Sequence, residues 1–228
     1  MSKSLIDLFY PPVCAGCDAL LLVNEKAICT TCRHEMPQTY HHLTPENEAF
    51  KKFYGKIHIE FAATFLHYHK RGIVQQMIHS LKYHGAESVG TTLGQWYGSI
   101  LFDTGALFDV DEIIPVPLHP KKLRERGYNQ VTAFGMALAD RLGVAYNDRL
   151  LVRKKYSKTQ TKKNLMGRNE VRNQEIFGIN SEETHQGKHL LLVDDVLTTG
   201  ATLESCARVL QGIPNTKISI VCMAMSHS

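Results

Sequence analysis

Leu190-Leu-Leu-Val-Asp-Asp-Val-Leu-Thr-Thr-Gly-Ala-Thr-Leu203 is the stretch that decides the fold of this 228-residue chain. The first four residues are apolar and predict a buried strand, which two carboxylates, Asp194 and Asp195, follow at its carboxyl end. Threonines and a glycine then lead into a helix predicted over Ala201–Leu210. In an open α/β sheet, the carboxyl ends of the strands are where ligands bind.

The remaining chain alternates between strand and helix patterns in the same way. Strands are predicted over residues 57–66, 111–116, 189–193 and 217–223, and helices over 71–82, 87–101 and 128–142. Strands that alternate with helices imply a parallel sheet with helices on both faces. The expected fold class is therefore α/β, with a parallel sheet flanked by helices.

The loop from Thr198 to Thr202 has the chemistry of a phosphate cradle. Its backbone N–H groups and hydroxyls, with the positive end of the following helix, attract an anion, and Gly200 lets the backbone approach it closely. Asp194 and Asp195 would repel a phosphate, but they suit the vicinal hydroxyls of a ribose, which donate hydrogen bonds to carboxylates. The combination predicts a ribose 5-phosphate site.

This run resembles the signature of the type I phosphoribosyltransferases, which bind phosphoribosyl pyrophosphate. The resemblance implies that Asp194 and Asp195 contact the ribose hydroxyls and form the catalytic pair, with Asp195 the candidate general base by position. It also implies Mg²⁺ bridging the diphosphate and the ribose hydroxyls. The implied phosphoribosyl-binding residues are Asp194, Asp195, Val196, Leu197, Thr198, Thr199, Gly200, Ala201 and Thr202.

A second segment looks like the strand and loop that hold pyrophosphate in that superfamily. It reads Ile113-Ile-Pro-Val-Pro117, followed by Leu118-His-Pro-Lys-Lys122. Its prolines stiffen the turn, and the basic side chains supply counter-charge to an anionic leaving group. The implied pyrophosphate-binding residues are Leu118, His119, Lys121, Lys122, Arg124 and Arg126.

Four of the six cysteines form two short motifs, Cys14-Ala-Gly-Cys17 and Cys29-Thr-Thr-Cys32. In a reducing compartment, two such motifs predict a structural zinc ion with four thiolate ligands, since each motif can present two thiolates to one tetrahedral ion. A redox pair and an iron–sulfur site are the alternatives. Gly16 is expected to serve a tight turn, and Cys206 and Cys222 are expected in the core.

The order of these features resembles the ComF family, which comprises competence proteins and their GntX-like relatives. Two further motifs carry the resemblance, Leu81-Lys-Tyr-His-Gly85 and Arg124-Glu-Arg-Gly-Tyr-Asn-Gln130. The family joins a zinc finger to a domain like the type I phosphoribosyltransferases. The expected organisation is a zinc-binding module over residues 1–38, a linker over 39–56 and a phosphoribosyltransferase-like domain over 57–228.

Charge is distributed unevenly along the chain, whose net charge is +4. Residues 119–172 contain 14 Lys and Arg against 4 Asp and Glu, which indicates an anionic partner. The family resemblance implies single-stranded DNA and the DNA-uptake machinery as partners in natural transformation. The alternatives are counter-charge for the phosphates of a small ligand and a solvated charged face.

Three interpretations of the site stay open at this point. The chain is a binding protein of DNA uptake, a phosphoribosyltransferase with an unidentified acceptor in nucleotide metabolism, or a non-catalytic sensor of a phosphoribosyl ligand. A glutamine-dependent amidotransferase is disfavoured, because the front cysteines are paired and the chain begins Met1-Ser2. A purine-salvage enzyme is disfavoured, because no segment clearly forms a base pocket.

The distribution of apolar residues indicates where in the cell the protein is located. No apolar run approaches the roughly 20 residues that a membrane-spanning helix needs, and Met1 to Tyr10 lacks an apolar core of signal-peptide length. The expected location is the cytoplasm, with peripheral attachment at the inner face of the cytoplasmic membrane as a variant of it.

Overall fold

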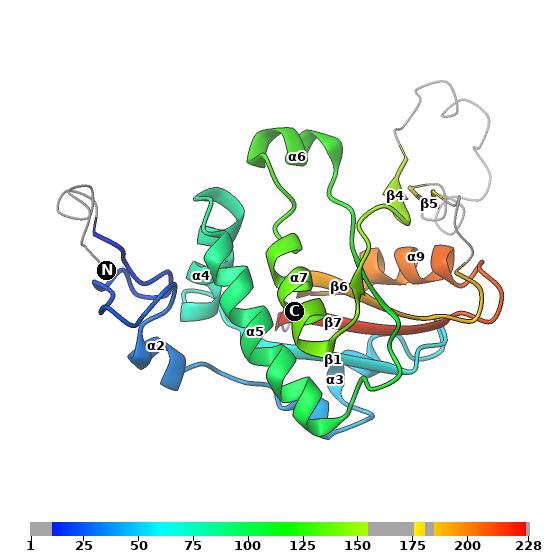
Figure 1. Cartoon of the computed structure of the whole chain (residues 1–228), viewed down its shortest axis with the longest axis horizontal. Helices are drawn as coiled ribbons and strands as arrows, with labels where there is room; N and C mark the ends of the chain where they lie inside the picture. Colours follow the sequence, from blue (N-terminus) through cyan, green and yellow to red (C-terminus); the bar gives the residue numbers. More distant parts are fainter. Residues whose placement is uncertain (1–10, 155–175, 181–184, 227–228) are drawn as a thin grey trace.

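A computed structural model of the chain describes residues 11–154, 176–180 and 185–226. Its centre is a five-stranded sheet with strand order β1-β7-β6-β2-β3, in which every neighbouring pair is parallel (Figure 1). The strands are β1 Phe61–Tyr68, β2 Glu112–Pro115, β3 Ala145–Tyr146, β6 His189–Leu197 and β7 Lys217–Ser226. The predicted parallel sheet is confirmed.

Helices cover both faces of this sheet, as Figure 1 shows. One face packs against α4 Ile73–Tyr83, α5 Glu87–Thr104 and α7 Thr132–Leu142. The other packs against α3 Glu48–Lys51, α9 Ala201–Leu210 and a hairpin of β4 Leu151–Arg153 with β5 Phe177–Ile179. Among the described residues, no helix combines the length and hydropathy needed to cross a bilayer.

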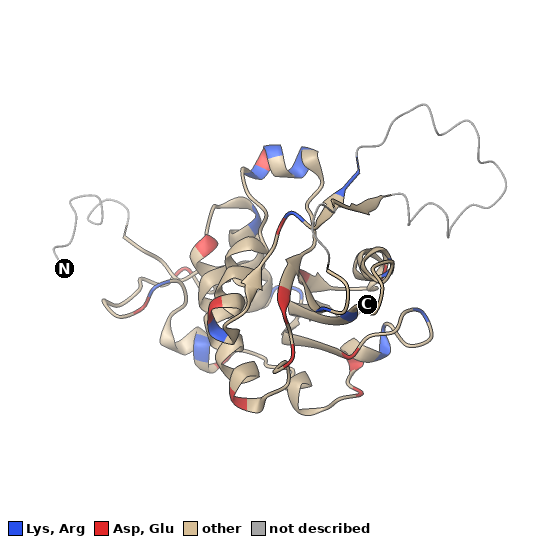
Figure 2. Cartoon of the chain, turned by 45° about the vertical axis from the view of Figure 1, so that its right-hand side comes forward, with Lys and Arg blue, Asp and Glu red and all other residues tan. Residues whose placement is uncertain are grey.

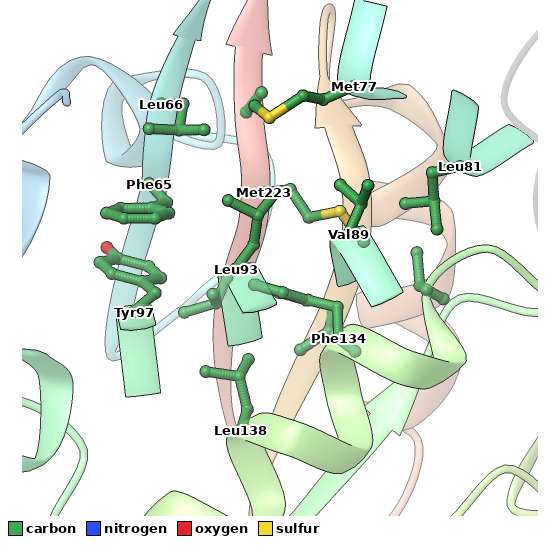
Figure 3. Close-up of a cluster of buried hydrophobic side chains, with 14 of the residues drawn as sticks. Phe65, Leu66, Met77, Leu81, Val89, Leu93, Tyr97, Phe134, Leu138 and Met223 are labelled. Atoms are coloured by element: carbon green, nitrogen blue, oxygen red, sulfur yellow. The ribbon is translucent and has the colours of Figure 1, made fainter. Parts of the chain in front are cut away.

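Alternate residues of the central strands supply two separate cores. Leu191 and Val193 face the side of α4, α5 and α7, whereas Leu190 and Leu192 face α9. In the first core, the Phe65 ring on β1 stacks on Tyr97 of α5 with ring centroids 4.6 Å apart (Figure 3). A strand buried on both faces has no polar alternation, which is why the run at Leu190 is continuously apolar.

Three glycines allow α5 and α7 to approach closely. Gly90, Gly94 and Gly98 lie four residues apart along α5, and an added Cβ at Gly94 would lie 2.6 Å from the carbonyl oxygen of Phe134. At Gly98, it would lie 2.8 Å from Cβ of Arg141. Glycine lowers helix propensity, but here the loss is offset by a contact that a larger residue would prevent.

Residues 39–56, expected to be a linker, carry ordered structure that packs on β1. Asn47 caps α3 by accepting hydrogen bonds from the N–H groups of Ala49 and Phe50, and its amide donates to the carbonyl of Ala62 over 2.8 Å. His41, in the 3-10 helix η1 His41–Leu43, is buried and bonded to Thr64. The polar residues of this segment are therefore capping and bonding groups.

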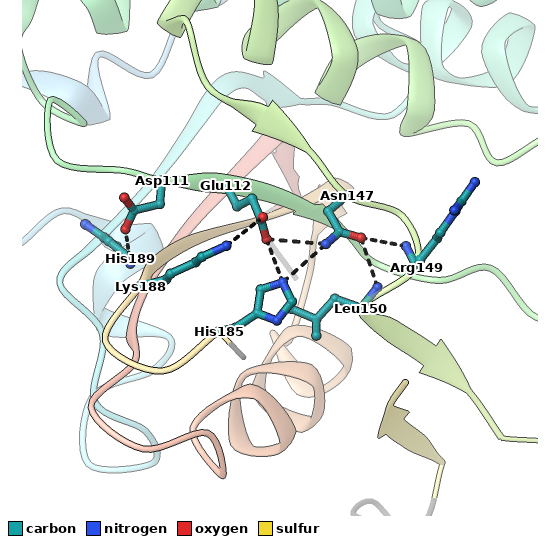
Figure 4. A network of polar contacts seen from close by, with 8 residues as sticks. All are labelled: Asp111, Glu112, Asn147, Arg149, Leu150, His185, Lys188 and His189. Atoms are coloured by element: carbon teal, nitrogen blue, oxygen red, sulfur yellow. Dashed lines mark hydrogen bonds and ion pairs between the residues drawn. The ribbon is translucent and has the colours of Figure 1, made fainter. Parts of the chain in front are cut away.

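The amino-terminal edge of the sheet is held by a polar network (Figure 4). The buried carboxylate of Glu112 pairs with Lys188 over 3.0 Å and with His185 over 3.1 Å, and the Asn147 amide also reaches it. Asp111 accepts a hydrogen bond from the N–H of His189 over 2.7 Å. These contacts join the starts of β2 and β6 to the end of β3.

Two local expectations differ from the structure. Part of the segment expected as a loop that holds pyrophosphate belongs to a helix, α6 Pro120–Arg126, which His119 caps and in which Pro120 occupies the first turn. The first strand begins at Phe61 rather than at 57, because Ile57 and Ile59 pack beside α3 instead. Residues 155–172, at the end of the basic region 119–172, lie outside the described residues.

Candidate functional site

The boundary between β2 and β6 positions the candidate site. From β2 the chain moves outward to β3, whereas from β6 it moves in the other direction to β7. Parallel sheets open a crevice at the carboxyl ends of the strands where the direction of winding reverses. Pro115 pairs with Val193, so Val116, which follows β2, and Asp194, near the carboxyl end of β6, reach this crevice together. Strand β6 continues to Leu197, so both aspartates lie inside the strand and not after it, as residues 189–193 alone would have placed them.

The loop after β6 leads directly into α9 through a left-handed residue. Gly200 has φ 82°, and an added Cβ there would lie 3.0 Å from the Phe53 ring. The Thr199 hydroxyl accepts from the N–H of Ala201, and both threonines of this turn are exposed. The small hollow at this helix end, about 50 Å³, is lined by Asp194, Val196, Leu197, Thr198, Thr199, Gly200, Ala201, Thr202 and Leu203.

A larger cavity of about 320 Å³ adjoins this hollow, because Asp194 and Thr202 line both. Its walls carry four cationic side chains, Lys82, Lys122, Arg126 and Arg153. The remaining lining residues are Val116, Pro117, Leu118, His119, Gln130 and Asp195. The two hollows thus place a helix N-terminus and a basic pocket on either side of one carboxylate.

Asp195 is held by three donors. One oxygen accepts from Lys82 Nζ over 2.8 Å and from Gln130 Nε2 over 2.8 Å, and the other accepts from the N–H of Val196 over 2.6 Å. Gln130 in turn accepts from the Arg126 guanidinium over 2.7 Å. Asp195 is therefore buried as a paired charge, with its side chain fixed by groups from α4 and from the turn before α7.

Asp194 lies in a different environment. One of its oxygens accepts from the N–H of Asp195 over 2.8 Å. Burial and the neighbouring Asp195 charge raise the pKa of Asp194 to about 8, which outweighs the opposing effects of that hydrogen bond and of Lys82. The two aspartates are thus unequal: Asp195 carries a compensated charge, and Asp194 faces both hollows.

The residues that the family resemblance implies for pyrophosphate binding fall into two groups, of which only one lines the cavity. Leu118, His119, Lys122 and Arg126 line the cavity, whereas Lys121 pairs with Glu125 on the outer side of α6, over 3.8 Å, and Arg124 is exposed. Helix α6 stands above the rest of the fold and buries none of its residues (Figures 1 and 2). Figure 2 shows the blue Lys and Arg positions of α6 and of β4 at the same end of the molecule.

Three residues of the site, Lys82, Gln130 and Arg153, were not predicted from the sequence. Lys82 and Gln130 belong to motifs quoted above only for their family resemblance, and they reach the site through tertiary packing. Arg153 ends β4, and its guanidinium stacks over the Phe177 ring at 5.2 Å. For Lys82, the available signal was its position near the end of a helix, beside Tyr83, which is exposed.

A larger cavity lies elsewhere in the described part of the chain. It measures about 600 Å³ and opens beside Glu112 and Asn147 at the amino-terminal edge of the sheet, within the network of Figure 4. The Glu112 charge there is already matched by Lys188 and His185. Since its walls lack a helix N-terminus with the basic side chains seen at β6, this cavity is a weaker candidate for an anionic ligand.

The four front cysteines converge as a metal site requires. Their sulfur atoms all lie within 4.8 Å of one another. Cys17 and Cys29 are 3.7 Å apart, close to the roughly 3.8 Å expected between two thiolates on one tetrahedral zinc ion. Burial opposes ionisation of Cys14, but N–H donors from Cys29 and Gly16 outweigh it and lower the pKa of Cys14 to about 7.

The glycine of the first motif is required for space. A Cβ at Gly16 would lie 2.7 Å from Ile73 and 3.2 Å from the Cys32 sulfur, whereas the left-handed residue of this turn is Asp18, with φ 57°. The expected tight turn is therefore present, but another residue makes it. The two remaining cysteines, Cys206 and Cys222, are fully buried as expected.

Two family models match the chain. A double zinc ribbon domain matches residues 5–43, and a phosphoribosyl transferase domain matches residues 132–228. They confirm the predicted class of fold and the zinc-ribbon character of the front module.

Curated relatives of this chain have names that agree with the expected family. DNA utilization protein YhgH of Salmonella typhi is 36% identical over 101 residues, which cover 44% of this chain and 43% of the relative. Competence protein F of Haemophilus influenzae is 29% identical over 111 residues, or 48% of each chain. The resemblance to the ComF family is thus confirmed, and the chain spans about half the length of the curated relatives it matches.

Solved structures include an adenine phosphoribosyltransferase, which aligns over 68% of this chain and 71% of its own. Its sequence identity is 16% and its TM-score is 0.35.

We predict that the front module binds one zinc ion and that Trp96 reports its loss. The Arg33 guanidinium in helix α2 Thr30–His34 lies 4.8 Å from the ring of Trp96 in α5, so unfolding of the module uncovers this ring. Cys29→Ser should remove zinc and shift Trp96 fluorescence to the red, with Cys206→Ser as a cysteine control that retains zinc. Elemental analysis that finds no zinc in chelator-free wild-type protein would contradict the assignment.

We predict that Asp194 makes stability depend on pH. Its pKa rises from 3.8 to about 8 on folding, so between these values the unfolded chain releases a proton that the folded chain retains. Stability then falls as pH rises through this window. Asp194→Asn should therefore raise Tm relative to wild type by an amount that is small near pH 4 and grows to several degrees at pH 8.

Thermal denaturation from pH 4 to 9 measures this difference. The exposed substitution Asp103→Asn serves as control, because it should give a difference that does not change across the window. A Tm difference for Asp194→Asn that is equally constant would refute the raised pKa.

Proposed function

For a chain that joins a double zinc ribbon to a phosphoribosyl transferase domain and is homologous to competence protein F, we propose a role in DNA uptake. In this proposal it binds phosphoribosyl pyrophosphate with Mg²⁺ at the end of β6 and binds single-stranded DNA on the adjoining basic surface. The observation that carries the proposal is the position of Asp194, between the hollow at the α9 N-terminus and the cavity with four cations.

Each part of the ligand has a counterpart in this arrangement. The 5-phosphate lies in the loop from Thr198 to Thr202, where the first N–H groups of α9 have no acceptor within the helix. The ribose hydroxyls donate to Asp194, which must be ionised to accept them both. The diphosphate extends into the cavity toward Lys122 and Arg126. Mg²⁺, when bound through diphosphate and ribose oxygens, neutralises charge that these side chains leave uncompensated.

Asp194 and Asp195 have different roles in this proposal. Asp194 contacts the ribose, whereas Asp195, already bonded to Lys82 and Gln130, keeps these two donors in place at the cavity wall. If an acceptor displaces pyrophosphate at the anomeric carbon, the cavity cations stabilise the negative charge of the leaving group. The same contacts serve a sensor that only binds. Pyrophosphate release measured with bases, amines and nucleic acids as acceptors separates the transferase from the sensor.

The proposed binding of DNA is supported by the names of the relatives and by the positive charge of the sequence next to the site. The relatives are called competence protein F and DNA utilization proteins. Lys154 and Ile176, which flank residues 155–175, are hydrogen bonded to each other, and Arg153 lines the cavity. The two ends of the most basic part of the sequence are thus next to the site. We place the protein in the cytoplasm, where its metal-binding thiols stay reduced.

We predict that phosphoribosyl pyrophosphate with Mg²⁺ binds to the wild-type chain. The double variant Asp194→Asn, Asp195→Asn should lose a hundredfold or more in affinity, because each charge-assisted hydrogen bond contributes roughly 1.5–3 kcal/mol. Titration calorimetry measures both, with Asp103→Asn as the matched acidic control. Equal affinity in the wild type and the double variant would exclude this site as the phosphoribosyl site.

We predict that single-stranded DNA binds without sequence preference and that binding weakens steeply with salt. The log–log slope should be about −0.7 per phosphate neutralised. Replacement of Lys158, Lys162 and Lys163 by Gln should flatten the slope by about two units and affect phosphoribosyl pyrophosphate less. Loss of diphosphate affinity with unchanged DNA affinity would instead assign these lysines to the small ligand.

A further inference from the structure

An exposed group of rings lies at the carboxyl end of α4. We call His79, Tyr83 and His84 the ring platform. The His79 ring centroid is 4.8 Å from that of Tyr83 and 5.2 Å from that of His84. The Tyr83 residue is 63% exposed, and both histidines are exposed as well.

Core packing does not account for these rings. Helix α4 buries Val74, Met77, Ile78 and Leu81 against the sheet and α5, and the ring platform lies off that face. An exposed pair of aromatic rings four residues apart stabilises a helix by only about 0.2–0.5 kcal/mol. The platform is therefore available to an outside ligand.

The ring platform adjoins two of the cations that line the cavity at the end of β6. Arg126, at the end of α6, places its guanidinium 5.1 Å from the Tyr83 ring centroid and also lines the cavity. Lys82, the residue before Tyr83, lines the same cavity. The Tyr128 hydroxyl donates to the carbonyl of Leu81, which fixes the end of α6 beside the end of α4.

Rings beside exposed cations suit one class of ligand. Nucleobases stack on aromatic side chains whatever their identity, while the phosphates of the same strand need cations a short distance away. Lys122 and Arg124 on α6 are exposed and supply them. Protein–protein interfaces are depleted in lysine, whereas Lys82 and Lys122 line the cavity next to the ring platform.

We propose that the ring platform stacks a base of single-stranded nucleic acid, with Tyr83 as the main stacking residue and α6 holding the adjacent phosphates. The proposal rests on the proposed binding of single-stranded DNA and names the surface that receives it. A strand bound in this way passes the mouth of the phosphoribosyl cavity, since Lys82 and Arg126 are shared between the two.

Binding of a fluorescent oligothymidylate to the full chain, followed by anisotropy, tests the stacking. Tyr83→Ala should weaken binding about tenfold or more, whereas Tyr83→Phe and Tyr83→Trp should keep it near the wild-type value. The slope against salt should not change in Tyr83→Ala, because no phosphate contact is removed. Phe108→Ala is the matched control: Phe108 is exposed and lies just before β2, at the opposite edge of the sheet.

A spectroscopic measurement separates stacking from a structural effect. Trp96 is the one tryptophan of the sequence, so Tyr83→Trp combined with Trp96→Phe gives a single reporter on the ring platform. The oligothymidylate should quench this reporter, whereas an abasic oligonucleotide of the same length and inorganic polyphosphate should not. Quenching by all three probes would indicate a general change of environment and would overturn the proposal.

The outcomes distinguish this proposal from the function on which it rests. If wild type binds the oligonucleotide and Tyr83→Ala binds it equally well, the ring platform is wrong and the DNA role stands. If wild type with its zinc bound does not bind oligonucleotide even at low salt, the DNA role itself is wrong, and the platform falls with it. Loss of affinity in Tyr83→Ala without quenching in the tryptophan variant would also overturn the stacking.

Discussion

The parallel pairing of β2 with β6 is the constraint on which the candidate site depends. Backbone hydrogen bonds set its register, and the N–H of Val116 donates to the carbonyl of Val193 over 2.9 Å. The two strands lead into loops of different chemistry, a stiff basic turn after β2 and a turn rich in threonine and glycine at the start of α9 after β6. A slip of one residue would turn Asp194 toward the opposite face and dismantle the site. The packed cores on both faces, which fix each strand by its apolar side chains, therefore also fix the ligand geometry.

Two adjacent carboxylates at a buried strand end create an electrostatic problem that the fold solves unequally. Asp195 is compensated by Lys82 and by the Gln130 amide, whose oxygen is bonded to Arg126. Asp194 has less compensation, which is why its pKa rises. Below about pH 8 the empty protein keeps Asp194 protonated, so a ligand that brings Mg²⁺ or hydroxyl donors to its ionised form must displace this proton and binds more tightly as pH rises. The paired aspartate, in contrast, contributes mainly by ordering the cavity wall.

How far the sequence predicts this molecule depends on how local each feature is. The run from Leu190 to Leu203 forms a strand, a loop and a helix from its own residues, so the fold class and the position of the loop before α9 could be predicted from it. The cysteine motifs are local in the same sense. Lys82, by contrast, reaches Asp195 only after α4 has packed on the sheet. Neither segment contains a sequence pattern that predicts this contact. The glycines of α5 only lower helix propensity when the segment is considered alone, because the helix that needs their small size, α7, is distant in sequence. Asn47 is likewise a residue type that is common in linkers, but in the structure it caps helix α3.

Helix α4 connects the metal module to the ligand site. At its first turn, Ile73 fills the space beside Gly16, and the cysteine cluster belongs to the same core as Val74 and Met77. At its last turns it carries Lys82, which pairs with Asp195, and Tyr83, which contacts Arg126. Because interiors are close-packed, a displacement at one end of an 11-residue helix cannot be absorbed locally and shifts the other end as well. The thiolate cluster leaves no open position for chemistry, yet it sets where the cavity lysine lies. The zinc module is thus part of the architecture of the site, although its metal lies outside the ligand cavity.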